Sequence, residues 1–289
     1  MAILVTGATG MFGSAVVSAL AQVGVEVLAM TRSESSAEKL THGNVTGVVG
    51  NLDDPESLPA LMQRVDRMFL VSPIHPSLGQ REVTAINAAT SSAGIKQIVK
   101  LYGAVRHEGD QLDTQHQMSI ERLKTCEVPW TLVSPQTVME TNLLGQIDGI
   151  KSERSMCGAA GNGRIGMVAL DDCIEVASTV LQSDPKQWNS ANLEITGPSA
   201  LTYNEIATEM SRAFNETITY VDMSEQEFSS MLLEYGFPEE DLEIQVLCHF
   251  RQMRNGKASL VTDTFEKITG KPATSIYDWM LKNLDLFDI

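Results

Sequence analysis

Short apolar runs alternate with longer amphipathic segments over the first half of the chain. The first run, residues 2–5, leads into Gly7-Ala-Thr-Gly-Met-Phe-Gly13 and then into a helical pattern that ends at Gly24. Five further runs of strand length follow, separated by segments of helical periodicity: residues 25–30, 45–49, 67–72, 97–102 and 130–134. Strands that alternate with helices predict an α/β protein with a parallel, doubly wound sheet and right-handed crossovers, the Rossmann arrangement.

The last third of the chain has a different pattern. An amphipathic helix over 171–181 and a strand over 193–196 complete the predicted sheet, and the capping boxes Thr202-x-x-Glu205 and Ser224-x-x-Glu227 open two later helices. Tyr203, directly after the first cap, is expected to be an exposed helix-start residue. A helical stretch to Met253 carries apolar residues that suit a mobile lid or pocket wall and the core equally well. We therefore expect a cofactor domain over 1–150, and over 151–289 the completion of the sheet with a smaller, mostly helical substrate lobe.

The glycine spacing after the first strand is the strongest chemical signal. Gly7 permits a sharp turn, Gly10 lets main-chain N–H groups approach a diphosphate, and Gly13 lets the helix lie close to the strand. An anion there would lie on a helix N-terminus, where the helix dipole favours negative charge. The motif predicts dinucleotide binding over Gly7, Thr9, Gly10, Met11 and Phe12, although an ordinary glycine-rich turn would look similar.

The end of the second predicted strand indicates which dinucleotide binds. NAD-binding folds usually place Asp or Glu here for the ribose 2′-hydroxyl, whereas an arginine accommodates the 2′-phosphate of NADP. This chain has Thr31-Arg32-Ser33 and no acid. Arg32 therefore favours NADP(H), and the alternative is a solvated arginine that begins the next loop.

Ligands of open parallel sheets bind beyond the carboxyl ends of the strands. Besides the glycine turn and Arg32, the residues expected to line the site are Asn51, Val71, Ser72, Pro73, Tyr102 to Ala104, and Ser134 to Thr137.

Composition and net charge limit the kinds of molecule that this chain is expected to bind. The formal charge of −16 opposes binding to nucleic acid or to an anionic membrane. No stretch approaches the length of about 20 apolar residues that spans a bilayer, and the chain begins with a strand, so a cytoplasmic location is expected. Four scattered cysteines without C-x-x-C spacing suggest neither a disulfide framework nor a zinc site. We thus expect a small-molecule substrate and no metal, and whether the chain forms a homodimer stays open.

With these motifs, the chain resembles the NmrA-like branch of the atypical short-chain dehydrogenases. That group contains quinone and azo-dye reductases, benzylic ether reductases, ergot-alkaloid dehydrogenase-like proteins and redox-sensing regulators. The matching segments are Gly7-Ala-Thr-Gly10, Arg32, 50–58, 93–101, His116, 128–135, 139–142, 163–172 and 196–207. The resemblance covers essentially the whole chain, and it implies a Rossmann fold and an NAD(P) cofactor. It also implies an adenine-pocket role for Asn51, where the family commonly has Asp.

The proton-transfer machinery of ordinary short-chain dehydrogenases is absent. None of the five tyrosines is followed four residues later by the lysine that would depress the pKa of its phenol. Tyr102, at the end of a strand, and His116, at a helix start, are the catalytic candidates; the first could equally pack on the cofactor ring and the second could be a hydrogen-bonded structural group. His75 and His107 lie in predicted loops and are weaker candidates, and His42 and His249 suit surface or packing positions.

These observations together predict an NADPH-dependent reductase of a flat conjugated small molecule such as a quinone, an azo compound or an enone. Hydride transfer would rely on proximity and orientation, and water can protonate the product. Two alternatives remain at this point: a non-catalytic NADP(H) sensor that acts through a partner and, more weakly, an enzyme of the nucleotide-sugar epimerase type.

Overall fold

The computed structural model describes residues 1–103, 105, 107 and 109–288. Seven strands form one sheet in the order β3-β2-β1-β4-β5-β6-β8, and the pairs from β3 to β6 are all parallel. The strands are β1 Ala2–Val5, β2 Glu26–Thr31, β3 Val45–Val49, β4 Arg67–Leu70, β5 Gln97–Leu101, β6 Trp130–Pro135 and β8 Ala191–Ile195. This order confirms the predicted Rossmann fold, and it reverses direction between β1 and β4, where such sheets bind ligands.

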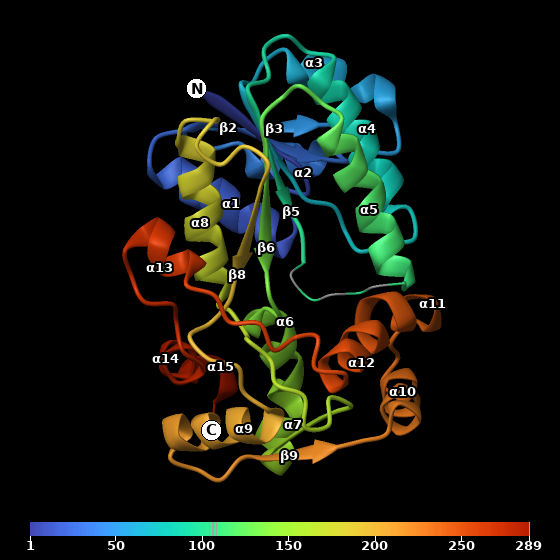
Figure 1. The fold of residues 1–289 in the computed structure, drawn as a ribbon, viewed down its shortest axis with the longest axis vertical. Helices are drawn as coiled ribbons and strands as arrows, with labels where there is room; N and C mark the ends of the chain where they lie inside the picture. The colour runs from blue at the N-terminus through green and yellow to red at the C-terminus, as the bar shows by residue number, and fades with distance from the viewer. Residues whose placement is uncertain (104, 106, 108, 289) are drawn as a thin grey trace. The chain divides into compact units, whose positions relative to one another are not determined.

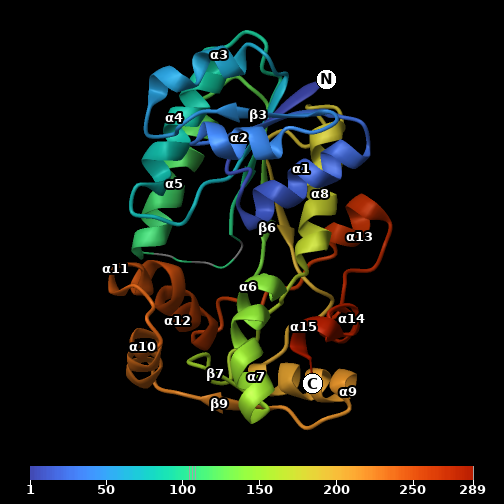
Figure 2. The ribbon, with the colours of Figure 1, turned by 180° about the vertical axis from the view of Figure 1, so that it is seen from behind.

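Helices cover both faces of this sheet. Figures 1 and 2 show α4 and α5 side by side on one face, and α1 and α8 on the other. The helices of this part are α1 Met11–Gln22, α2 Glu34–Leu40, α3 Pro59–Met62, α4 Leu78–Thr90, α5 Gln111–Lys124 and α8 Leu170–Gln182, with a 3-10 turn η1 at Pro55–Ser57. The central strands β1, β4 and β5 are almost wholly buried, as expected for a parallel sheet with helices on both faces, whereas the edge strands β3 and β8 are partly exposed.

Helix boundaries depart from the sequence pattern at N-terminal ends. The helical periodicity of the sequence predicts a start at Val83, but helix α4 begins at Leu78, and its first turn buries Leu78 and Gly79. The periodicity likewise predicts a start at Gln115, but helix α5 begins at Gln111, and Leu112 in its first turn is buried. In both cases tertiary burial of one apolar side chain extends the helix beyond the periodic stretch.

By packing, the described chain divides into two compact units. The first, which carries most of the sheet, comprises residues 1–102, 111–134 and 174–193, and the second comprises 103–110, 135–173 and 194–289. The predicted division at residue 150 assigns a function to each part and stays a prediction. Among the described residues, no helix combines the length and the apolar character needed to cross a membrane.

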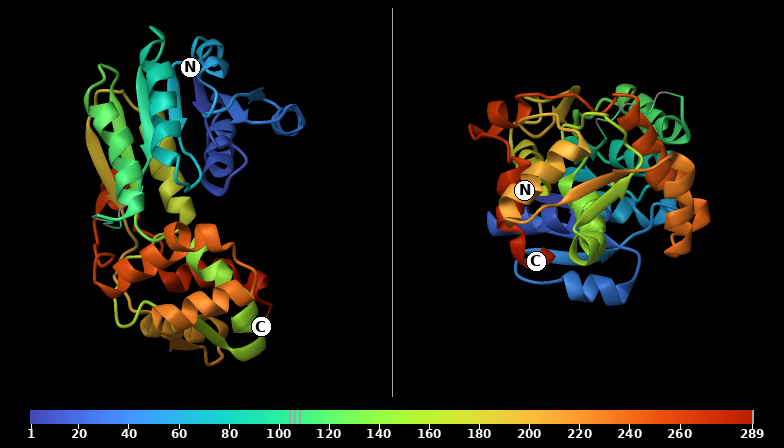
Figure 3. Two further views of the ribbon diagram at one scale, coloured as in Figure 1. Left: turned by 90° about the vertical axis from the view of Figure 1, so that its right-hand side faces the viewer. Right: turned by 90° about the horizontal axis from the view of Figure 1, so that it is seen from below.

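The second unit is built mostly of helices. Its elements are α6 Met139–Leu143, η2 Leu144–Gln146, α7 Ile147–Glu153, β7 Ser155–Gly158, α9 Tyr203–Phe214, β9 Thr219–Asp222, α10 Glu225–Glu234, α11 Glu239–Leu242, a π-helical turn η3 Glu243–Leu247, α12 Cys248–Arg254, α13 Thr264–Thr269, α14 Ile276–Lys282 and α15 Leu284–Phe287. Strands β7 and β9 pair in parallel, seen from below in Figure 3. Both predicted capping boxes are present, at the starts of α9 and α10.

The expectation for Tyr203 is wrong. Its side chain is fully buried and stacks on Tyr220 at 4.9 Å and on Phe250 at 6.0 Å between ring centroids. The capping box had suggested a solvent-facing helix start, but the aromatic ring turns inward and anchors the core of this unit. The apolar residues of α10 to α12 contribute to the same core: Met231, Leu232, Phe237, Leu242, Val246, Leu247 and Phe250.

Candidate cofactor site

The glycine turn between β1 and α1 has the geometry that its spacing predicts. Gly7 has a positive φ of 57°, which L side chains rarely adopt. A Cβ at Gly13 would lie 2.1 Å from the carbonyl oxygen of Gly7, so the helix approaches the strand too closely for any side chain. A Cβ at Gly10 would meet only that same oxygen, at 3.4 Å, which is an ordinary contact. The fold therefore requires glycine at positions 7 and 13, whereas position 10 faces open space.

Gly10 also caps the helix that follows. It has extended backbone angles, its N–H donates to the carbonyl of Gly7, and no side chain caps the first turn of α1. That turn carries no acidic residue. Because the first N–H groups of a helix have no partner within the helix, this end of α1 offers hydrogen-bond donors and a positive dipole to an anion.

A buried threonine fixes the turn against the neighbouring strand. Thr6 is fully buried, its hydroxyl donates to the carbonyl of Val71 at 2.7 Å, and it accepts from the N–H of Val71 at 2.8 Å. The ends of β1 and β4 are thereby held at the switch point of the sheet. This role of Thr6 could not be predicted from the sequence, because a threonine that ends an apolar strand gives no signal of its tertiary partner.

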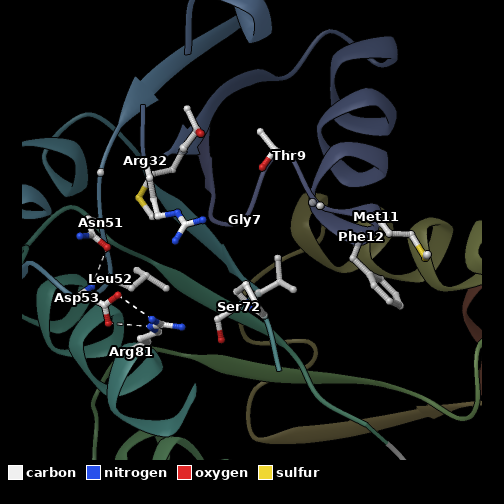
Figure 4. Close-up of a pocket in the computed structure, with 17 residues that line it drawn as sticks. Gly7, Thr9, Met11, Phe12, Arg32, Asn51, Leu52, Asp53, Ser72 and Arg81 are labelled. Carbon is white, nitrogen blue, oxygen red and sulfur yellow. Dashed lines mark hydrogen bonds and ion pairs between the residues drawn. The ribbon is translucent and has the colours of Figure 1, made fainter. Parts of the chain in front are cut away.

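A pocket of about 340 Å³ lies beyond the ends of β1 to β4. The residues that line it are Gly7, Thr9, Gly10, Met11, Phe12, Gly13, Met30, Thr31, Arg32, Gly50, Asn51, Leu52, Asp53, Val71, Ser72, Pro73 and Arg81. Figure 4 shows Met11 and Phe12 at one end and the guanidinium groups of Arg32 and Arg81 toward the other. Every residue predicted to bind the cofactor therefore lines one cavity, and their binding role stays a prediction.

Two arginines reach the β2–β3 side of this pocket. Arg32 is exposed, and no hydrogen bond or ion pair of its side chain is found among the described residues. Arg81, from α4, donates two hydrogen bonds to the carboxylate of Asp53, at 2.7 and 2.8 Å. These bonds hold the pKa of the Asp53 carboxyl below its usual value. Arg81 thus neutralises the acid that lies in this part of the pocket and leaves Arg32 available to an anion.

Asn51 stabilises the loop after β3 through its own hydrogen bonds. Its side-chain oxygen accepts from the N–H of Asp53 at 3.0 Å, and its own N–H donates to the hydroxyl of Ser57 at 3.0 Å. Asp54 caps the short helix at Pro55 through the N–H of Glu56, as its position before a proline predicts. The loop after β3 is therefore held in shape by its own side chains.

A buried ion pair connects the pocket to the end of β5. The ammonium of Lys100 lies 3.0 and 2.9 Å from the two carboxylate oxygens of Glu82, and both side chains are almost fully buried. The hydroxyl of Ser72, which lines the pocket, donates to Glu82 at 3.2 Å. The same ammonium lies 5.7 Å from the centre of the Tyr102 ring. Sequence reasoning missed this network, since its members come from three separate elements.

The two catalytic candidates contact one another. The rings of Tyr102 and His116 meet edge to face, with centroids 4.9 Å apart and an interplanar angle of 83°. Tyr102 follows β5 and His116 lies in α5, so strand and helix together bring a phenol and an imidazole to the same place. His75, by contrast, serves its own loop, where Nδ1 accepts from the N–H of Ser77 at 2.9 Å.

The segment after β6 carries two buried polar side chains without assigned hydrogen bonds among the described residues. Gln136 and Thr137 are buried, and both amide atoms of Gln136 and the hydroxyl of Thr137 lack a hydrogen-bond partner among the described residues. Buried polar side chains without partners are rare and commonly face a ligand or an ordered water. These side chains are thus candidates for contacting a polar group of a ligand. The predicted site residue Ala104 lies outside the described residues.

The described cysteines are free thiols with no disulfide between them. Burial raises the pKa of the Cys126, Cys157 and Cys173 thiols above its usual value. A thiol with a raised pKa is a poor nucleophile, since the thiolate is the reactive form. These three cysteines therefore behave as inert packing groups, in line with their scattered positions in the sequence.

A parallel sheet in this strand order, with a glycine turn opening a pocket at its switch point, defines the NAD(P)-binding Rossmann class. The sequence model of the NmrA-like family matches residues 1–116. The resemblance to this family that the motifs predict is thereby confirmed over these residues.

Relatives of known activity match the chain over nearly its full length. An NAD(P)H azoreductase from Xenophilus azovorans is 29% identical over 279 residues, with 96% of each chain covered. Quinone oxidoreductase 2 of Escherichia coli is 26% identical, with 95% of this chain and 96% of the relative covered.

Solved structures share the fold at low identity. An NADPH complex of the Escherichia coli quinone oxidoreductase gives a TM-score of 0.86 at 23% identity, covering 98% of this chain and 99% of the other. A Citrobacter triphenylmethane reductase complexed with NADP(H) gives a TM-score of 0.86 at 21% identity with the same coverage. A nucleoside-diphosphate-sugar epimerase from Staphylococcus aureus gives 0.84 at 18% identity, so the fold by itself does not select an activity.

Proposed function

We propose that this chain is an NADPH-dependent reductase that delivers hydride to a flat, conjugated small molecule of the quinone, azo or enone type. The observation that carries the proposal is that one pocket holds both the glycine turn and Arg32, whose side chain forms no ion pair among the described residues. One relative is an NAD(P)H azoreductase, and another is a quinone oxidoreductase. Both support an oxidoreductase of this kind.

The choice of NADPH rests on the charges around the pocket. The adenosine 2′-phosphate is an anion, and this chain has a formal charge of −16, so a local cation is needed to bind it. Arg32 lies where the 2′-phosphate of a Rossmann cofactor is expected. Since Asp53 is held by Arg81, the pocket keeps no free acid on this side to accept a ribose 2′-hydroxyl in the manner of NAD enzymes.

The residues present would hold the cofactor by its phosphates and leave its ring to react. The N–H groups at the start of α1 would bind the diphosphate, and Asn51 and Leu52 would contact the adenine. NADPH, when bound, supplies the hydride. Ser72, oriented by the buried Glu82, lies where the end of β4 meets the pocket and can position the far end of the cofactor.

Protonation of the product does not require a dedicated acid. The chain has no Tyr-x-x-x-Lys, and the rings of Tyr102 and His116 contact each other edge to face. A reduced quinone or hydrazine oxygen or nitrogen is basic enough to take a proton from water. Rate would then depend on how well the acceptor is held against the cofactor.

The discriminating experiment measures NADPH oxidation by the purified chain with a panel of quinones, azo dyes and enones, with NADH in parallel. We expect turnover with at least one conjugated acceptor and a preference for NADPH. If NADPH binds by calorimetry but no acceptor is reduced, the reductase proposal is wrong and the sensor is favoured. If NADPH does not bind at all, both fail.

A further inference from the structure

We propose that His107, Cys248 and His249, in the second unit, form a binding site for a divalent transition metal of the zinc class. His107 lies in the segment between β5 and α5, and the other two residues open α12, directly after the π-helical turn η3. One ligand atom from each of the three side chains lies within 4.8 Å of the other two. Imidazole nitrogen and thiolate sulfur are the ligands that zinc prefers in proteins.

The distances allow closure around an ion. Bonds of about 2.0 Å from zinc to nitrogen and about 2.3 Å to sulfur place tetrahedral ligand atoms about 3.5 Å apart. Starting from the 4.8 Å limit, the three atoms must therefore draw together by up to about 1.3 Å. His107 lies outside any helix or strand, whereas Cys248 and His249 are held in α12, so a small shift of the His107 backbone and side chain can supply part of this movement.

Asp110 holds the ring of His107 through its Nδ1 atom. The Nδ1 atom of His107 lies 2.8 Å from a carboxylate oxygen of Asp110. A carboxylate only accepts, so Nδ1 carries the hydrogen and Nε2 keeps its lone pair. A carboxylate behind a metal-binding histidine is the common outer-shell arrangement at zinc sites, where it fixes the tautomer and increases the basicity of the ligand.

The other two ligands follow one another at the start of α12. His249 contributes a ring nitrogen, and Cys248 contributes a sulfur that, as a thiol, donates to the carbonyl of Ile244. A bound cation would displace that proton, and the thiolate and Asp110 would together balance its two positive charges.

Packing alone offers a competing explanation. The rings of His107 and His249 meet edge to face at 4.6 Å, an arrangement that stabilises aromatic pairs without any ion. That explanation accounts for the two histidines but gives Cys248 no role beyond its bond to Ile244. It also makes no use of the lone pair that Asp110 leaves on Nε2. The two explanations differ in whether Cys248 and Asp110 affect metal affinity.

The proposal departs from the expectation that the chain binds no metal. That expectation rested on the absence of C-x-x-C spacing, whereas here two ligands are adjacent and the third lies far away in the sequence. With three protein ligands, a fourth position stays open to water or to another donor. The ion would tie the segment around His107 to α12 within the second unit.

Cobalt(II) provides the test, because a thiolate ligand gives it a charge-transfer absorption band in the near ultraviolet. The full chain, freed of metal by dialysis against a chelator, is titrated with Co²⁺ and then with Zn²⁺. We expect one cobalt ion per chain, a thiolate band, and loss of the band when zinc displaces cobalt. Absence of any saturable binding, or binding without the thiolate band, would overturn the proposal.

Variants separate the metal site from simple packing. Cys248→Ser should abolish the band, and Asp110→Asn should keep the band but weaken affinity by about 10- to 100-fold. Cys126→Ser, a half-buried cysteine of the other unit, is the matched control and should leave band and affinity unchanged. Thermal unfolding of each variant verifies that it is folded. A band that persists in folded Cys248→Ser, or an unchanged affinity in Asp110→Asn, would contradict the assignment.

Discussion

The two sides of the sheet's carboxyl edge are built in different ways. On the β1–β2 side, main-chain groups of one continuous turn and the single side chain of Arg32 form the candidate cofactor site. On the β4–β5 side, Ser72, Glu82, Lys100 and Tyr102 form a network from separate elements around a buried ion pair. The β1–β2 side can bind an anion because glycines leave its main chain accessible. The β4–β5 side keeps its shape because its polar side chains stabilise one another.

Because the two sides are built differently, different substitutions should disrupt them. A backbone site is lost when a side chain fills the space that a phosphate needs, even though the fold persists. A buried charge network is lost when one partner is removed, because the other charge then stays buried without compensation. Binding experiments should therefore report on the first side and stability experiments on the second.

The largest effect is expected at Gly10. Its extended backbone suits a β-branched residue, and a Cβ there contacts only the Gly7 oxygen at 3.4 Å, so Gly10→Val should fold. The added methyl groups occupy the space where a diphosphate meets the backbone, so NADPH binding should be abolished, as measured by calorimetry. Gly94→Val, outside the pocket and with its nearest described neighbour at 3.7 Å, is the control. Retained affinity in folded Gly10→Val would contradict the diphosphate assignment.

The buried pair should give the next largest effect, on stability. Lys100→Met leaves the Glu82 carboxylate buried and unpaired, which should cost about 3–5 kcal/mol in the free energy of unfolding. The double variant Lys100→Met with Glu82→Gln removes both charges, keeps an acceptor for Ser72, and should recover most of that loss. Urea denaturation measures both. Equal stability of the single and double variants would show that the uncompensated charge is not the cause.

Arg32 should set the choice of cofactor. Loss of a charge-assisted contact in Arg32→Ala should remove about 1.5–3 kcal/mol of binding free energy, which lowers NADPH affinity about ten- to a hundredfold and leaves NADH nearly unchanged. Arg64→Ala, an exposed arginine outside the pocket, is the matched control. An equal loss for both cofactors would show that Arg32 does not discriminate between them.

The smallest effect is expected at the aromatic pair. Tyr102→Phe and His116→Ala should each lower the rate of quinone reduction by less than about tenfold, whereas loss of a true general acid costs roughly 10²–10⁴-fold. Filling the pocket wall at Pro73 should reduce turnover more, because the pose of the reactants governs the rate. Stopped-flow measurement of NADPH oxidation compares the three. A hundredfold loss for Tyr102 or His116 with cofactor affinity intact would establish acid catalysis by that residue.

The sequence by itself determined the features that depend on short-range order. The alternation of apolar runs gave the parallel sheet, the capping boxes gave the starts of α9 and α10, and the glycine spacing gave a turn that only glycine can form at positions 7 and 13. Each of these follows from backbone sterics or side-chain period within about a dozen residues, so no distant partner is needed.

The tertiary structure alone decided which distant side chains meet. Tyr203, expected at the surface, became the centre of a buried aromatic stack, because Tyr220 and Phe250 offered it apolar contacts that a capping motif does not encode. The pairing of Glu82 with Lys100 and the neutralisation of Asp53 by Arg81 likewise join residues from different elements. Such contacts depend on how helices and strands pack against one another. The pattern of polar and apolar residues along the sequence does not specify that packing.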